Sequence, residues 1–178
     1  LEAIVPTEGK LELIHLLSRT GVKSIEVTAF VRPDRVPQHA DAEKLVSLLE
    51  AVEGVRFRAL YLNSKGFLRG AQFPQLEMEG YLLLAASETF LKENNNSTLE
   101  EAVKEIGNLL ELFKEKRLPL ERLMISTAFG HYSEGVIPPE KVLAIIEKVL
   151  EKVSSHGLTL PEITLADTTG WANPFSVQ

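Results

Sequence analysis

The sequence contains no cysteine, so it can form no disulfide and offers no thiolate to a metal ion. It has no uncharged apolar run long enough to span a bilayer and no stretch of signal-peptide character. Basic residues are outnumbered, 19 against 25 acidic ones, which gives a formal net charge of -6. These absences argue against nucleic-acid and membrane partners, and the lack of cysteine fits a reducing compartment.

Apolar strands that alternate with amphipathic helices run along the 178 residues, the length of one domain or part of a larger one. Five strands are predicted, at residues 21–30, 55–62, 82–87, 123–128 and 163–170. Strands that are separated by helices pair in parallel, as in βα units. Two architectures fit this order, an open doubly wound sheet and part of a (β/α)8 barrel.

Two observations favour the barrel. No strand is followed by the glycine-rich sequences G-x-G-x-x-G or G-x-x-x-x-G-K-S/T, which counts against a nucleotide-binding open sheet. Polar residues within or at the ends of several strands suit a barrel interior. We therefore expect an α/β fold of the (β/α)8 TIM-barrel type, present here as an incomplete portion with about five parallel strands.

Helix boundaries are marked by capping residues. Asp41 is expected to cap a helix that ends at Gly54, and Ser97 and Glu100 form a capping box for a long helix after it. Residues 129–135 are predicted to form a polar loop that is bounded by glycines. The loop at 31–41, with two arginines and a histidine, is either functional or a solvated connection.

A carboxylate stands in the middle of the first predicted strand. Glu26 lies between Ile25 and Val27, and burial of an unpaired carboxylate is costly, so we expect it to meet a cation, hydrogen-bond donors or a wet cavity. The alternative is that Glu26 points outward to a lysine or arginine. Asp167 ends the fifth strand, and the two acids suggest one polar centre that several strands share.

Further polar residues fall at or beyond the C-terminal ends of strands, where active sites collect in both parallel architectures. They are Asn63, Ser87, Asn94, Thr127 and His131. The three asparagines at 94–96 equally favour a turn, so their presence alone does not decide between a structural and a binding role.

Four motifs occur in order, at residues 25–38 (IEVTAFVRPDRVPQ), 85–97 (AASETF followed by NNNS), 129–135 (FG and EG) and 166–170 (ADTTG). Together they resemble hydroxymethylglutaryl-CoA lyase, within a wider group of metal-dependent barrel lyases and Claisen-type synthases. The resemblance spans essentially the whole chain. It implies a pyruvate carboxyltransferase-like TIM barrel that cleaves 3-hydroxy-3-methylglutaryl-CoA to acetyl-CoA and acetoacetate in leucine degradation, with Mg²⁺ or Mn²⁺.

The resemblance also implies the site residues. Glu26 and Asp167 match two acids that hold an arginine near the substrate hydroxyl, and we expect them to be catalytic. Residues 1–178 are expected to be a partial catalytic barrel that lacks the first strand and the C-terminal strands. The metal ligands are then expected outside this chain, which would be inactive alone. The positions that correspond to substrate-binding residues are Phe30, Gln38, Asn63, Ser87, Asn94 and Thr127.

One departure leaves other substrates and functions open. Where the family usually reads Phe-Gly-Cys-Pro-Tyr-Glu-Gly, this sequence has His131, Tyr132 and Ser133 before Glu-Gly. A synthase that condenses an acyl-CoA with a 2-oxo acid, like isopropylmalate or homocitrate synthase, shares the ADTTG motif. A truncated barrel that acts as a non-catalytic interaction module is the third reading. We expect an acyl-CoA substrate, a homodimer when intact and a cytoplasmic location, with a mitochondrial one left open.

Overall fold

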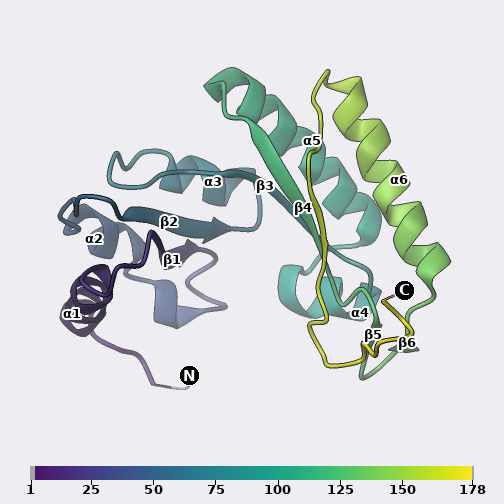
Figure 1. The fold of residues 1–178 in the computed structure, drawn as a ribbon, viewed down its shortest axis with the longest axis horizontal. Helices are drawn as coiled ribbons and strands as arrows, with labels where there is room; N and C mark the ends of the chain where they lie inside the picture. The colour runs from purple at the N-terminus through teal and green to yellow at the C-terminus, as the bar shows by residue number, and fades with distance from the viewer. Residues whose placement is uncertain (1–2, 178) are drawn as a thin grey trace. The chain divides into compact units, whose positions relative to one another are not determined.

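The computed structural model describes residues 3–177. The chain divides into two compact units, one up to Met78 and one from Glu79 onward. In Figure 1 the first is coloured purple to blue and the second teal to yellow. Each unit combines parallel strands with helices, as the sequence pattern predicts.

The first unit contains two strands and four helical segments. They are α1 Thr7–Ser18, β1 Ser24–Phe30, η1 Pro37–His39, α2 Ala42–Ser47, β2 Arg56–Tyr61 and α3 Ser64–Gly70. β1 and β2 pair in parallel, with Phe30 opposite Tyr61. The register shifts between Glu26 and Thr28, so Val27 is an extra residue on β1 and marks a bulge.

An apolar core holds the first unit together. Leu45 and Val46 of α2 are fully buried in one cluster with Phe57 of β2 and Ile14 of α1. Buried apolar surface contributes about 25 cal/mol per Å². A six-residue helix has little stability of its own, so packing of this kind is what stabilises α2.

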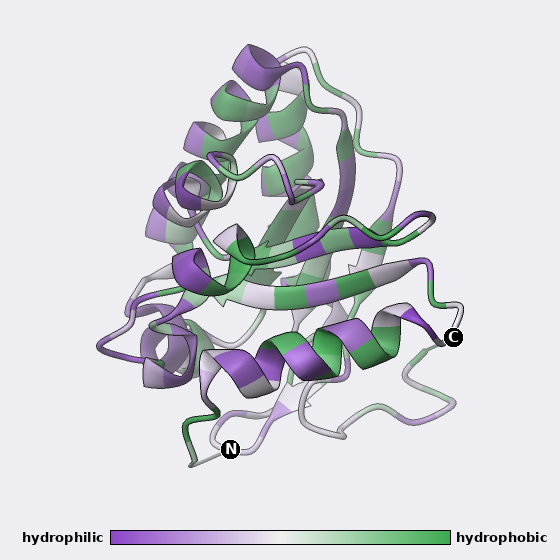
Figure 2. Ribbon diagram, turned by 90° about the vertical axis from the view of Figure 1, so that its left-hand side faces the viewer, coloured by the Kyte–Doolittle hydropathy of each residue, from purple (hydrophilic) through white to green (hydrophobic). Residues whose placement is uncertain are grey.

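α1 contributes little to that core. Ile14 is buried, but Leu13 and Leu16 on the same helix are 57% and 54% exposed. Figure 2 colours successive stretches of this helix alternately green and purple, because its apolar residues are not gathered on one side. The helix is therefore only partly covered by the first unit.

The second unit contains a three-stranded parallel sheet, a short hairpin and its helices. Its elements are β3 Gly80–Ala85, α4 Glu88–Phe90, η2 Leu91–Asn95, α5 Leu99–Lys116, β4 Leu120–Ser126, β5 Gly130–His131, β6 Gly135–Val136, α6 Pro139–Ser155 and β7 Ile163–Leu165. The sheet order is β3-β4-β7. β5 and β6 pair antiparallel.

Two long helices supply most of the second core. Ile106, Leu110 and Phe113 recur at helical spacing on α5 and are at most 2% exposed, and Ile145 and Val149 repeat the pattern on α6. The two helices pack side by side, as Figure 1 shows, and α5 also packs against β3. Their amphipathic sequences explain why these helices were the easiest to predict.

The capping box of α5 lies one residue later than expected. Glu101 N–H donates to Thr98 Oγ1 at 3.2 Å and Thr98 N–H donates to Glu101 Oε2 at 2.8 Å, so Ser97 and Glu100 are not the pair. The preceding π-helical turn ends at Asn96, whose φ is 50°, and Ser97 N–H bonds back to the Leu91 carbonyl. Ser97 thus belongs to the exit of that turn, and the cap falls on the next residue.

The five predicted parallel strands are confirmed as β1, β2, β3, β4 and β7. Two other expectations are wrong. The second helix ends at Ser47 instead of Gly54, because Leu49 and Val52 reach the core from irregular backbone. The predicted loop at 129–135 contains the β5–β6 hairpin, since Gly135 at a φ of 74° permits the tight return.

Candidate active site

Glu26 is exposed on β1, so the expectation that its carboxylate is buried is wrong for the described chain. Ile25 and Val27 pack against the first core, which leaves Glu26 on the other face of the strand. Its partner in the register is Arg58 on β2. The exposed carboxylate carries no large desolvation penalty, and its catalytic role stays a prediction.

The loop after β1 is fastened to α1. Lys10 Nζ donates to the Gln38 carbonyl at 2.6 Å and to Asp41 Oδ1 at 2.5 Å, and Thr7 Oγ1 donates to Asp41 Oδ2 at 2.8 Å. Asp41 therefore anchors the loop and makes no side-chain cap on α2, contrary to expectation. Burial opposes its ionisation, but the bonds from Lys10 and Thr7 outweigh burial and lower the pKa of Asp41. The backbone of half-buried Gln38 is thereby fixed.

His39 lies beside the end of β1, with Nδ1 3.3 Å from Thr28 Oγ1. Burial lowers the pKa of His39, and the Lys10 ammonium lowers it further against the pull of Asp41 and Glu26. The imidazole is therefore favoured in its neutral form. In the sequence His39 was one member of a polar loop, and only its contact with the strand sets it apart.

Phe30 and Asn63, both predicted to bind substrate, have structural contacts in the first unit. Phe30 is 2% exposed and stacks on Phe73 with ring centroids 6.1 Å apart. The Arg69 guanidinium lies 5.4 Å from its ring centroid. Asn63 Oδ1 accepts the Gly66 N–H at 2.9 Å and so caps α3. Their binding roles stay predictions.

Ser87 and Thr127 join the ends of β3, β4 and β7 in the second unit. Ser87 N–H donates to Thr127 Oγ1 at 3.1 Å, and Thr127 N–H donates to Thr168 Oγ1 at 2.8 Å. Thr127 has a φ of 53° and donates its hydroxyl to the Ser126 carbonyl. Both Ser87 and Thr127 are fully buried, so these residues fix the strand ends, and contact with a ligand stays a prediction.

Glu134 makes contacts with the end of β3 that the sequence analysis did not single out. Its Oε1 accepts Ser87 Oγ at 2.6 Å and Thr89 N–H at 2.7 Å, while Oε2 lies 3.6 Å from Lys141 Nζ. Burial raises the pKa of Glu134, but these donors outweigh it and lower the pKa to about 2. An acid next to a glycine at positive φ, within a motif of the family, was the available signal.

His131 is buried in the hairpin. Its Nδ1 lies 2.8 Å from Ser133 Oγ, and its ring meets that of Phe90 edge-on at 6.1 Å. Its Nε2 is buried without a hydrogen-bond partner among the described residues. Asn94 lies on η2, a π-helical turn of the kind often found at functional sites, and its side chain is exposed and donates to the Phe90 carbonyl.

Asp167 is exposed two residues beyond β7. Its Oδ1 accepts the Trp171 N–H at 2.7 Å. The Trp171 side chain packs on Gly130, where an added Cβ would come within 2.5 Å of Trp171 Cγ, and Thr169 Oγ1 donates to the Gly130 carbonyl at 2.7 Å. The ADTTG turn is thus tied to the hairpin, and convergence of Asp167 with Glu26 stays a prediction.

Within residues 3–177, no three histidine, aspartate or glutamate side chains are grouped so that they could hold a metal ion. The donor groups described here therefore do not by themselves fit a divalent metal. No helix in this part of the chain has the length and hydrophobicity needed to cross a membrane.

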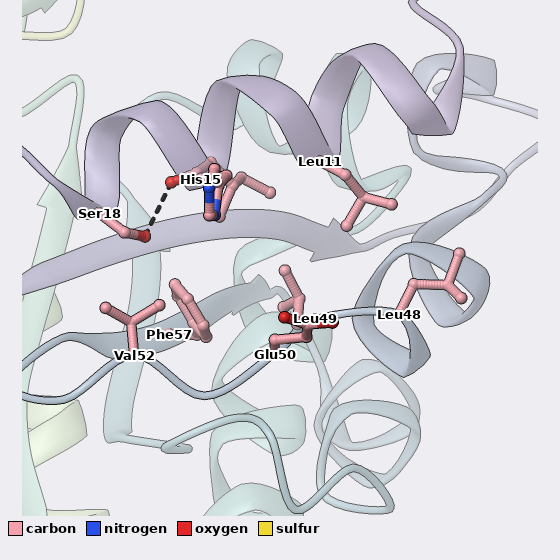
Figure 3. A pocket seen from close by; sticks show the side chains of 9 residues that line it. Leu11, His15, Ser18, Leu48, Leu49, Glu50, Val52 and Phe57 are labelled. Atoms are coloured by element: carbon pink, nitrogen blue, oxygen red, sulfur yellow. Dashed lines mark hydrogen bonds between the residues drawn. The ribbon is translucent and has the colours of Figure 1, made fainter.

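A cavity of about 170 Å³ lies in the first unit, between α1 and the segment that follows α2 (Figure 3). Its walls are mainly apolar, with His15 and Glu50 as the charged or titratable members. Phe57 lines it from the beginning of β2, whereas Asn63 follows the end of that strand. The cavity is therefore distinct from the polar strand ends.

Comparison with known proteins identifies relatives along the whole chain. The HMGL-like family model matches residues 1–178. The chain is 34% identical over 177 residues to the cytoplasmic 3-hydroxy-3-methylglutaryl-CoA lyase of Mus musculus, covering 99% of this chain and 49% of that protein. It is 33% identical over 174 residues to the mitochondrial enzyme of Arabidopsis thaliana, covering 98% and 35%. The chain thus spans about half or less of the length of these curated relatives.

Solved structures of HMG-CoA lyases also match this chain. The HMG-CoA lyase of Brucella melitensis matches with a TM-score of 0.82 at 30% identity, over 99% of this chain and 59% of that one. An HMG-CoA lyase of Acinetobacter baumannii in complex with coenzyme A and 3-methylmalate matches at 0.81 and 31%, over 99% and 54%. The chain therefore belongs to the HMGL-like family, and its parallel strands form an incomplete portion of a TIM barrel.

Proposed function

We propose that the complete gene product cleaves 3-hydroxy-3-methylglutaryl-CoA to acetyl-CoA and acetoacetate. The observation that supports this most is the similarity to HMG-CoA lyases over nearly every residue of the chain. One of these relatives was solved with coenzyme A and 3-methylmalate. Both 3-methylmalate and the proposed substrate carry a hydroxyl group near a carboxylate, and the hydroxyl of the proposed substrate is the group that becomes a ketone.

The reaction is a retro-Claisen cleavage. A base takes the proton of the tertiary hydroxyl, the oxygen becomes the ketone of acetoacetate, and the carbon–carbon bond breaks. Its electron pair passes to the thioester enolate, which takes a proton at carbon and leaves as acetyl-CoA. Stabilisation of the charge on the two oxygens is the main demand on the site.

Glu26 and Asp167 are the proposed catalytic residues. The exposed Glu26 carboxylate is accessible to an arginine that the rest of the gene product would supply, and a charge-assisted pair would orient that cation toward the enolate oxygen. Asp167 uses Oδ1 to accept the Trp171 N–H, so Oδ2 is the oxygen proposed to accept the substrate hydroxyl. Both roles require the ionised carboxylate, which only accepts hydrogen bonds, whereas a protonated carboxyl group also donates one.

The proposed substrate-binding set keeps all six residues, but their contacts in the described structure suggest a division. Gln38 lies on the short helix η1 and Asn94 on η2, both beyond the strands, and Asn63 and Asn94 are exposed. Phe30, Ser87 and Thr127 are buried, and they would act by fixing the strand ends on which the others stand. We propose direct substrate contact for the first group.

The family is generally dependent on a divalent metal. We propose that Mg²⁺ or Mn²⁺ is held by residues outside this chain, because the described residues bring no metal-binding group together. The proposed substrate is an acyl-CoA and the proposed assembly a homodimer. We propose a cytoplasmic location, although the relatives include both cytoplasmic and mitochondrial enzymes.

The test is an assay of the complete gene product with Mg²⁺ or Mn²⁺ and 3-hydroxy-3-methylglutaryl-CoA. Release of acetoacetate and acetyl-CoA in equal amounts is the expected result. If no acetoacetate appears while a 2-oxo acid condenses with acetyl-CoA, the synthase reading replaces the proposal.

A gene product without either activity would favour the interaction module. The sequence of the flanking gene can distinguish this interaction module from the two enzymes before any assay. An Arg-Asp-Gly before this chain and a His-x-His after it would eliminate a non-catalytic barrel, since they would supply the catalytic arginine and the metal ligands of the family.

A further inference from the structure

The segment between β3 and α5, residues 87–96, has little regular structure to hold its path. It passes through the three-residue α4 and the π-helical η2, and it leaves through Asn96 in the left-handed region. Helical turns this short are not stable by themselves. Contacts from elsewhere in the second unit must therefore fix the segment.

The β5–β6 hairpin, residues 130–136, supplies those contacts. Glu134 Oε1 accepts both Ser87 Oγ and Thr89 N–H, across more than 40 residues of sequence. The ring of His131 meets that of Phe90 edge-on, and Tyr132 OH donates to Glu93 Oε2 at 3.4 Å. Glu134 makes the two shortest of these contacts.

A continuous chain of hydrogen bonds runs from Glu134 to Asn94. Ser87 Oγ donates to Glu134 at 2.6 Å and accepts Phe90 N–H at 3.0 Å, and the Phe90 carbonyl accepts Asn94 Nδ2 at 3.1 Å. An ionised carboxylate only accepts, so the direction of the Ser87 hydroxyl is settled and its one proton is committed to Glu134. The side chain of Asn94 is thus linked to the hairpin through three bonds.

We propose that Glu134 is a positioning residue, which acts through Ser87 and Phe90 to orient Asn94 toward the substrate. The proposal rests on the proposed function, because Asn94 is a candidate ligand for that substrate only. Glu134 suits this task because its side chain is 23% exposed and Lys141 Nζ lies 3.6 Å from its second oxygen, so it remains charged and fixed. Charge-assisted bonds of this kind are the stronger ones in proteins.

Amide hydrogen exchange in the complete gene product tests the structural part. Glu134→Ala removes the acceptor of Thr89 N–H and the partner of Ser87, so exchange at both Thr89 and Phe90 should accelerate at least about tenfold, the factor that loss of one such bond implies. Ser87→Ala breaks only the second link, so Phe90 should accelerate and Thr89 should not. The control is Glu147→Ala, an exposed acid on α6.

Unchanged exchange at Thr89 in Glu134→Ala would overturn the proposal, and so would a Ser87→Ala variant that affects both amides equally. If Glu134→Ala does not fold, Ser87→Ala and the isosteric Glu134→Gln decide. This measurement needs no substrate, so it stands even if the gene product proves not to cleave 3-hydroxy-3-methylglutaryl-CoA.

Steady-state kinetics tests the link to Asn94. Glu134→Gln and Asn94→Ala should each raise KM about threefold to tenfold with little change in kcat, as expected when ground-state and transition-state binding are lost together. The double variant should be no worse than Asn94→Ala alone, because the two residues act through one contact. Additive effects, or a loss in kcat with KM unchanged, would overturn the positioning role.

Discussion

Several polar residues that the sequence predicts to be functional are held differently in the two units. In the second unit Ser87 and Thr127 are fully buried and hydrogen-bonded to each other, and Glu134 closes the network. In the first unit Glu26 is exposed, and the loop that carries Gln38 is tied down through its backbone. Polar residues that suggest chemistry in the sequence are therefore buried and structural at Ser87 and Thr127, and exposed at Glu26 and, in the second unit, at Asp167.

The helices of the two units also differ in how far their apolar residues are buried. α5 and α6 bury a continuous apolar face, whereas α1 leaves Leu13 and Leu16 more than half exposed. α5 and α6 thus bury their apolar faces more completely than α1 does. Stability should consequently depend more on the buried residues of α5 and α6 than on the exposed leucines of α1, whereas activity should depend on exposed polar residues such as Glu26 and Asp167.

A pair of leucine truncations should produce the largest difference between the units. Leu110→Ala removes a side chain with no exposed surface and should cost about 2–5 kcal/mol in the free energy of unfolding. Leu13→Ala, at 57% exposure, should cost about 0.5 kcal/mol or less. Urea denaturation of the complete gene product measures both, and equal losses would contradict the comparison.

Loss of the Lys10 anchor should have the next largest effect. Lys10→Met leaves the half-buried Asp41 carboxylate without its cation and frees the Gln38 carbonyl, at a cost of roughly 1–3 kcal/mol. Lys44→Met is the matched control, because its pair with Glu8 is exposed to solvent and should contribute little to stability. Thermal unfolding followed by circular dichroism measures the loss of stability in the two variants. An equal loss in Lys44→Met would contradict the role of Lys10 as an anchor.

Lowering the pH should destabilise the second unit by protonating Glu134. Its pKa is about 2 in the folded chain against 4.5 in the reference state, so its contribution is complete above pH 4.5 and is lost as the pH falls toward 2. With solvent screening, that contribution is on the order of 1–2 kcal/mol. Glu134→Gln should therefore be less stable than the wild type at pH 6, with the difference shrinking toward pH 3. A constant difference across this range would contradict the assignment.

The cap of α3 should give the smallest effect. Asn63→Ala removes the acceptor of the Gly66 N–H and should cost about 1 kcal/mol, whereas Asn63→Ser retains an N-cap oxygen and should cost less. Thermal melting of the two variants provides the comparison. Equal losses would show that Asn63 is not held by its capping bond.

Local patterns were sufficient to predict the five parallel strands and the two long helices, because their burial follows simple periodicity. The exposure of Glu26 was not predictable, since it depends on which face of β1 meets α1 and α2. Contacts such as Lys10 with Asp41 or Glu134 with Ser87 join residues 31 and 47 positions apart, and no local pattern encodes them. The predicted position of the capping box was wrong by one residue because Ser97 and Thr98 both fit the motif.

The most direct test of the division between exposed and buried polar residues compares Glu26→Gln with Ser87→Ala in the cleavage of 3-hydroxy-3-methylglutaryl-CoA by the complete gene product. Glu26→Gln should lower kcat by about a hundredfold or more, because it removes a charge that acts in the transition state. Ser87→Ala should leave kcat within about threefold while raising KM. Equal losses of kcat, or a larger loss in Ser87→Ala, would contradict this account.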